Sequence, residues 1–147
     1  SLLEKAQRPK VTIIGVGPER QRLAEQARRK AVEIHLPGAV SPNQMSDWYR
    51  DARYVVVPSR REGFGLVAAE AAAMGRAVVG TTVGGISAVV QDGVSGILVE
   101  PGDAEDLAQA LLAVDPAMGE VGPSMVAVLS SERHGSYLRQ ICEDFLN

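Results

Sequence analysis

The residues best suited to chemistry in this sequence are two glutamates, Glu62 and Glu70, on either side of a short glycine-bearing segment. Gly63 and Gly65 let backbone amides approach a ligand closely. The apolar run that begins at Leu66 predicts a helix, whose N-terminal amides and dipole favour an anion such as a phosphate. A carboxylate only accepts hydrogen bonds, so each glutamate suits a pair of vicinal hydroxyls. The pattern predicts a nucleotide-sugar site, with the diphosphate at the amides, the sugar hydroxyls at Glu62 and the ribose diol at Glu70.

Two other interpretations of these carboxylates compete with this one. Glu70 is the only ionisable residue between Leu66 and Met74, and a buried charge without a partner is costly. A salt bridge to Arg60 or Arg61 would satisfy it without any ligand. The pair could also be the acid and base of a glycosidase, whose retaining members hold their carboxyls about 5–5.5 Å apart. Spacing along the chain fixes no such distance, and the strand–helix pattern favours the nucleotide interpretation.

Short apolar runs alternate with helical patterns through most of the chain, which predicts parallel strands joined by helical crossovers. The fold class is therefore α/β, a Rossmann-like doubly wound parallel sheet. The strands are expected at 11–14, 32–36, 54–57, 77–79 and 96–99, and the helices at 19–30, 42–51, 66–74, 86–91 and 104–114. Ligands of such sheets lie beyond the carboxyl ends of the strands, where residues 59–65 fall.

The pattern stops after Asp115. Proline and glycine at 116, 119, 122 and 123 predict a loop, and residues 137–146 predict a closing helix. We therefore expect one nucleotide-sugar-binding domain over residues 1–147, with 115–147 forming that loop and helix.

Composition excludes several function classes. The chain has 147 residues and a formal net charge of −3, so it carries no basic nucleic-acid surface. Cys142 is its only cysteine, which rules out a disulfide within the chain. One cysteine and two histidines make no metal site, so no metal or cofactor is expected. With no signal pattern and no apolar run of about 20 residues, we expect a cytoplasmic protein.

The segment Glu62-Gly-Phe-Gly-Leu-Val-Ala-Ala-Glu70 resembles the Glu-x7-Glu signature of the retaining, group 1 glycosyltransferases of the GT-B fold. Further segments in the family's order support the resemblance. They are Val11–Pro18, Ile34–Gly38, Val57–Ser59, Gly84-Gly85, Asp92–Val99 and Asp103–Ala110. The matching segments run over about residues 10 to 114.

The resemblance implies a nucleoside-diphosphate sugar donor, transfer with retention of anomeric configuration, and no metal requirement. Glu62 would contact the donor sugar as the catalytic residue, Glu70 the ribose, and the segment Leu36–Gly38 would lie near the base. A tight turn at Gly15 and Gly17 would lie near the ligand. The predicted donor-binding residues are Gly15, Gly17, Leu36, Pro37, Gly38, Gly63, Phe64, Gly65, Leu66 and Glu70.

The sequence also departs from the family's pattern. In the family this domain opens with a further strand and helix, whose Arg and Lys neutralise the diphosphate, and Ser1–Lys10 resembles only the end of that helix. The acceptor-binding domain is missing too, so this chain is expected to need it as a partner, and homo-oligomers are possible. The alternatives are a non-catalytic nucleotide-sugar-binding module, a truncated remnant or, less favoured, a sugar-nucleotide epimerase.

Other motifs have plainer interpretations. The segment Gly15-Val-Gly-Pro18 lacks the third glycine of a dinucleotide fingerprint, since Arg20 occupies that position. The basic residues between 20 and 30 alternate with acidic ones, which favours a solvated helix face, although Arg20 could reach a phosphate. We assign Trp48 and Tyr49 to packing.

Overall fold

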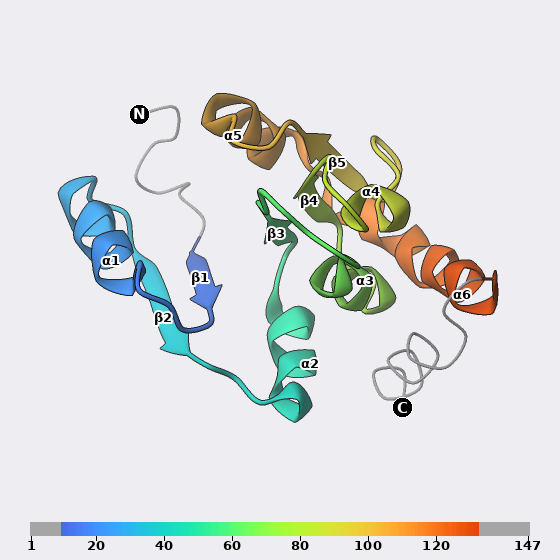
Figure 1. The fold of residues 1–147 in the computed structure, drawn as a ribbon, viewed down its shortest axis with the longest axis horizontal. Helices are drawn as coiled ribbons and strands as arrows, with labels where there is room; N and C mark the ends of the chain where they lie inside the picture. The colour runs from blue at the N-terminus through green and yellow to red at the C-terminus, as the bar shows by residue number, and fades with distance from the viewer. Residues whose placement is uncertain (1–9, 133–147) are drawn as a thin grey trace. The chain divides into compact units, whose positions relative to one another are not determined.

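The computed structural model describes residues 10–132 (Figure 1). The chain divides into two compact units, residues 1–45 and residues 46–147. The boundary falls within the helix α2 (Pro42–Asp51), whose bounds agree with the predicted ones. A single domain over the whole chain stays a prediction.

The first unit contains β1 (Val11–Ile14), α1 (Arg20–Arg29) and β2 (Ile34–Gly38). The two strands are parallel, and Val11 lies opposite Ile34. The predicted second strand, 32–36, was wrong in its bounds, because Val32 lies in the turn that caps α1. Its amide donates to the carbonyl of Ala27 at 2.9 Å, in the way that helices close with a left-handed residue. That residue is Ala31, at φ 51°.

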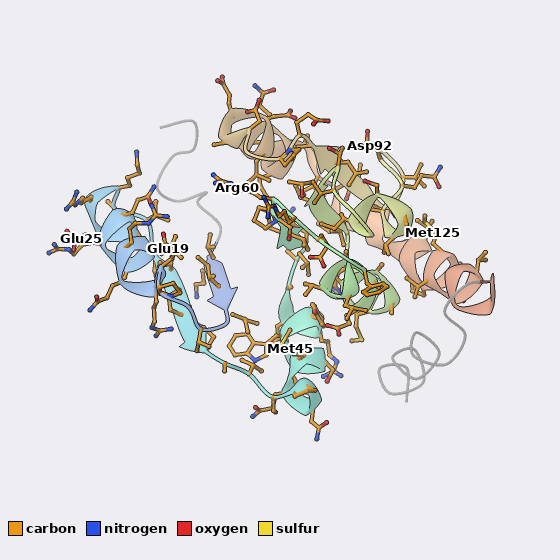
Figure 2. All side chains as sticks on the ribbon, viewed as in Figure 1. Glu19, Glu25, Met45, Arg60, Asp92 and Met125 are labelled. Atoms are coloured by element: carbon orange, nitrogen blue, oxygen red, sulfur yellow. The ribbon has the colours of Figure 1, made fainter. Side chains whose placement is uncertain are left out.

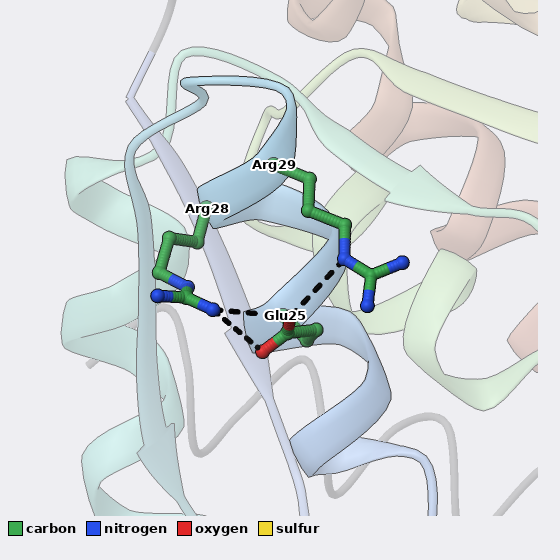
Figure 3. A network of polar contacts seen from close by, with 3 residues as sticks. All are labelled: Glu25, Arg28 and Arg29. Carbon is green, nitrogen blue, oxygen red and sulfur yellow. Dashed lines mark hydrogen bonds and ion pairs between the residues drawn. The ribbon is translucent and has the colours of Figure 1, made fainter.

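The polar face of α1 confirms the solvated interpretation of the basic stretch. Glu25 accepts hydrogen bonds from Arg28 at 3.1 Å and from Arg29 at 3.1 Å (Figure 3). Glu19 pairs with Arg22 in the same way. All of these side chains are exposed, and exposed ion pairs contribute little to stability.

The second unit holds a three-stranded parallel sheet in the order β3-β4-β5 (Figure 1). Its elements are β3 (Val55–Val57), α3 (Leu66–Ala73), β4 (Val78–Thr81), α4 (Ile86–Val89), β5 (Gly96–Val99) and α5 (Ala104–Ala113). The predicted α/β alternation and parallel pairing are confirmed. The pairing itself forms two sheets, β1-β2 and β3-β4-β5, where the sequence predicted one.

The central strand β4 is buried along its whole length, which explains the apolar residues Val78 and Val79 with which it begins. Val79 packs in a core cluster with Val99 and Ala110. Helix α3 is also buried through its alanines, and it packs against β3, β4, α4 and α6 (Gly122–Glu132). The small side chains of α3 let these neighbours approach closely.

The loop predicted after Asp115 is wrong for the described residues. A 3-10 helix, η2 (Pro116–Val121), leads directly into α6 (Gly122–Glu132). The Asp115 carboxylate caps η2 by accepting from the amide of Ala117 at 2.9 Å. Gly122 permits close packing, since a Cβ there would lie 2.5 Å from the carbonyl oxygen of Ala72 on α3. The closing helix predicted at 137–146 lies outside the described residues.

Between residues 10 and 132, no single helix is long and apolar enough to cross a membrane. Helix α5 and the segment Pro116–Val128 reach the length and apolar composition of a membrane span only when taken together, and that pair is bent by 87°.

Candidate functional site

The loop of residues 59–65 follows β3, at the carboxyl ends of the parallel strands. The hydroxyl of Thr81, the last residue of β4, donates to the Ser59 carbonyl at 2.6 Å and ties the start of the loop to the neighbouring strand. Arg60 extends from this loop (Figure 2), and both Arg60 and Arg61 are exposed. The loop therefore lies where the sequence predicted a ligand.

The Glu62 side chain folds back onto its own loop. One carboxylate oxygen accepts from the amides of Gly63 at 3.2 Å and Gly65 at 3.3 Å, and the other accepts from the Ser59 hydroxyl at 3.3 Å. The Gly65 amide, which the resemblance assigned to the ligand, is thus directed at Glu62. A carboxylate has about four acceptor positions, so this one still has capacity for a ligand's hydroxyls.

A second glycine segment, Gly84-Gly85, packs against the backbone of the loop. The amide of Gly85 donates to the Gly63 carbonyl at 3.0 Å. A Cβ on Gly84 would lie 1.8 Å from the carbonyl oxygen of Glu62, and one on Gly85 would lie 2.2 Å from that of Phe64. The two backbones are therefore in direct contact. The sequence showed this glycine pair only as part of a family pattern, and nothing in it revealed the contact.

Helix α3 begins at Leu66, directly after the loop. Gly65 adopts the left-handed conformation at φ 69° and has no side chain to cap the helix. The first amide to bond within this turn is that of Ala69, which donates to the Gly65 carbonyl at 2.9 Å. The amides before it point out of the helix start, as an anion site requires. The side chains of Phe64 and Val67 are exposed beside them, at 69% and 46%.

Glu70 lies in the second turn of α3 and is half-buried. Its carboxylate accepts a hydrogen bond from the Tyr49 hydroxyl at 2.7 Å, and Tyr49 on α2 is only 3% exposed. The predicted alternative, a salt bridge to Arg60 or Arg61, does not occur in the described part of the chain. Sequence reasoning assigned Tyr49 to packing alone and missed this role, because the pairing crosses from one helix to another.

The Tyr49 hydroxyl is a neutral donor. Burial first, and then the hydrogen bond to Glu70 and its negative charge, raise the pKa of Tyr49 well above the ordinary 10.0. The phenol therefore keeps its proton at neutral pH and donates it to the carboxylate.

The predicted residues of the first unit also meet one another. The Gly15 amide donates to the Gly38 carbonyl at 2.8 Å, and both glycines have positive φ, 127° and 90°. The Arg20 guanidinium donates to the Leu36 carbonyl at 2.6 Å, and the phosphate contact considered for it stays a prediction. Pro37 lies within β2, and the carbonyl of Gly17 accepts from the Arg20 amide at 3.3 Å.

The parallel strands and the loop after β3 define an α/β protein with a candidate ligand site at the carboxyl ends of its strands. Comparison with known proteins identifies the family. The family model for glycosyl transferases group 1 matches residues 1–114. The chain belongs to this family, and its α/β fold with parallel sheets is that of the GT-B glycosyltransferases.

The chain is similar to named glycosyltransferases over most of its own length. It is 43% identical over 126 residues to D-inositol 3-phosphate glycosyltransferase 1 of Catenulispora acidiphila. This alignment covers 78% of this chain and 30% of that protein. It is 46% identical over 91 residues to D-inositol 3-phosphate glycosyltransferase of Paenarthrobacter aurescens, covering 62% of this chain and 22% of that protein. The chain thus spans less than a third of the length of these relatives.

Solved structures show the same fold. Sucrose-phosphate synthase from Thermosynechococcus elongatus aligns with a TM-score of 0.74 at 30% identity, covering 88% of this chain and 38% of that one. A variant of S. aureus TarM, solved with UDP among its ligands, aligns with a TM-score of 0.72 at 25% identity and covers 94% of this chain and 28% of that one.

Proposed function

We propose that this chain binds the nucleoside-diphosphate sugar donor of a group 1 glycosyltransferase that transfers the sugar with retention of configuration. The observation that carries the proposal is the arrangement of Glu62 and Glu70 about the uncapped start of α3. Each carboxylate is held by a hydrogen bond from the protein, and outward-pointing amides lie between them in sequence. Membership of the glycosyl transferases group 1 family supports the same conclusion.

In this proposal the diphosphate lies at the first amides of α3, beginning with that of Leu66. Glu70 accepts hydrogen bonds from the ribose diol, and Glu62 accepts them from hydroxyls of the sugar. The loop contacts of Glu62 fix its carboxylate in advance, which reduces the cost of ordering it when the donor binds.

The chemical contribution of these residues is positioning and electrostatic stabilisation. Outward amides at a helix start stabilise the negative charge that develops on the departing nucleoside diphosphate. Glu62 holds the sugar in the geometry for attack by the acceptor. We assign no protein nucleophile, and the Ser59 hydroxyl that donates to Glu62 at 3.3 Å serves to orient that carboxylate.

The acceptor and the base are proposed from the relatives. Those in Catenulispora and Paenarthrobacter are named for D-inositol 3-phosphate, which makes this the first acceptor to try. The TarM variant was solved with UDP, which makes UDP the first nucleotide to try. The acceptor-binding part of the enzyme would have to be supplied together with this chain in an assay of transfer.

The proposal is tested by calorimetric titration of the chain with UDP, GDP and ADP, in buffer containing EDTA. We expect saturable binding of one nucleotide, and tighter binding of the corresponding sugar nucleotide. Binding only after a divalent cation is restored would contradict the metal-free site. Failure of all three nucleotides to bind, with and without a cation, would contradict a donor site in this chain.

A further inference from the structure

The hydrogen bond between Tyr49 and Glu70 joins a buried phenol to a carboxylate at the candidate site. The two oxygens are 2.7 Å apart, which is the usual length of a hydrogen bond donated by a hydroxyl. Tyr49 is almost completely buried, so its neighbours restrict the positions that the ring can adopt. The hydroxyl is consequently a restrained donor that orients the more flexible glutamate side chain.

Nothing on α3 itself can orient this carboxylate. The helix has the sequence Leu-Val-Ala-Ala-Glu-Ala-Ala-Ala, in which Glu70 is the only polar residue. Neither Arg60 nor Arg61 forms an ion pair with it in the described part of the chain. Over residues 10–132, the Tyr49 hydroxyl is the hydrogen-bond partner of the Glu70 side chain.

The end of α2, which carries Tyr49, is itself anchored to the turn after α3. The Arg76 guanidinium donates to the Ala52 carbonyl at 3.2 Å and to the Met74 carbonyl at 3.2 Å. One side chain therefore connects the residue after α2 with the residue after α3. This connection links the ends of the two helices that carry the tyrosine and the glutamate.

The direction of the hydrogen bond leaves Glu70 free to accept others. The phenol is neutral and donates, so it uses one acceptor position of a single oxygen. The remaining positions of the carboxylate can accept from both hydroxyls of a vicinal diol. A carboxylate held in this way does not have to be ordered when a ligand binds.

We propose that Tyr49 is a positioning residue, which holds the Glu70 carboxylate in the orientation that accepts hydrogen bonds from the nucleotide ribose. The inference rests on the proposed function, because it requires a nucleotide whose ribose reaches Glu70. Tyr49 itself does not contact the ligand, and it acts only through the carboxylate.

The experiment compares Tyr49→Phe, which removes the hydroxyl and keeps the ring, with the matched control Tyr54→Phe. Tyr54 packs partly buried against the core cluster of the same unit, and its hydroxyl has no hydrogen bond within residues 10–132. The 147-residue chain and its variants are titrated with UDP and with 2′,3′-dideoxyuridine 5′-diphosphate, which lacks the diol. If GDP or ADP is the nucleotide that binds, it and its dideoxy analogue are used instead. Circular dichroism melts ensure that every titration is made on folded protein.

We expect Tyr49→Phe to weaken UDP binding roughly tenfold, because a carboxylate that has lost its orienting hydrogen bond must be ordered when the ribose binds. Binding of the dideoxy analogue should not change, and Tyr54→Phe should bind both ligands like the parent chain. In a Glu70→Ala background, adding Tyr49→Phe should cause no further loss, since the tyrosine acts through the glutamate.

Other outcomes overturn the inference in distinguishable ways. If Glu70→Ala weakens UDP binding and Tyr49→Phe does not, the donor site stands and the positioning role falls. If Tyr49→Phe weakens both nucleotides equally, the tyrosine supports the fold of the site and does not orient the carboxylate. If the parent chain binds no nucleotide at all, the proposed function fails and this inference fails with it.

Discussion

The carboxylate of Glu62 accepts a hydrogen bond from the amide of Gly65, three residues further along its own loop, at 3.3 Å. The acidic side chain thus takes up a donor that a bound phosphate could otherwise use. The start of α3 lies immediately beyond, with amides that point outward. The loop amides therefore order the Glu62 carboxylate. The amides at the start of α3 can still bind an anion.

Glu62→Ala should weaken binding of the sugar nucleotide more than binding of the free nucleoside diphosphate. The lost hydrogen bonds to sugar hydroxyls would be worth about 1–3 kcal/mol, because the acceptor is charged. Parallel calorimetric titrations with both ligands measure the difference. Glu62→Gln serves as a control for loop order, since its amide oxygen can still accept from Gly65. Equal losses for the two ligands in Glu62→Ala would exclude the contact with the sugar.

Glu70→Ala should weaken binding of the free nucleoside diphosphate by about 1–3 kcal/mol, if Glu70 accepts from the ribose. The substitution also leaves the buried Tyr49 hydroxyl without its acceptor, so a lower melting temperature is expected as well. Affinity and melting temperature are measured on the same samples. A lower melting temperature with unchanged affinity would show that Glu70 serves the fold alone.

Much of the architecture could be predicted from sequence because its signals are local. Short apolar runs indicated the strands, of which β4 is buried throughout and β1 is mostly exposed, and the bounds of β5 and α2 were correct. The cap on α5 is equally local, since Asp103 accepts from the amides of Glu105 and Asp106 at 3.0 and 2.9 Å. These features depend on neighbours only a few residues apart.

The features that sequence could not provide depend on contacts between distant segments. The glycines at 119 and 122 suggested a loop, yet they lie inside helical segments because their missing side chains let η2 and α6 approach the chain around α3. The alternative interpretation of Glu70 paired it with a nearby arginine, and its partner among the described residues is Tyr49 on another helix. Glycine as a turn residue and glycine as a packing residue look identical in a sequence.

Gly85→Ala should destabilise the second unit by on the order of 1–3 kcal/mol, as overpacking does in a close-packed interior. The added Cβ would lie 2.2 Å from the backbone of Phe64, so the site loop would have to move. Gly63→Ala is the matched control in the same loop, because a Cβ there meets no atom within 4 Å. Urea unfolding of both variants measures the difference. Equal stability of the two would contradict the backbone contact.

Stability should fall more steeply above pH 10 in the parent chain than in Tyr49→Phe. The pKa of Tyr49 is raised in the folded state, above the 10.0 that the unfolded chain has. Below that pH both states keep the proton, and the contribution of Tyr49 is complete. As the pH rises further, the unfolded chain releases its proton while the folded chain retains it, so unfolding becomes more favourable.

Urea unfolding at pH 8 and at about pH 11 measures this effect, on the parent chain, Tyr49→Phe and the control Tyr54→Phe. Tyr54→Phe should lose stability with pH as the parent does, because it retains the buried phenol beside Glu70. Tyr49→Phe should lose less, since it has no proton at that position to release. The same loss in all three proteins would mean that Tyr49 titrates normally, and the phenol would then not be the neutral donor that holds Glu70.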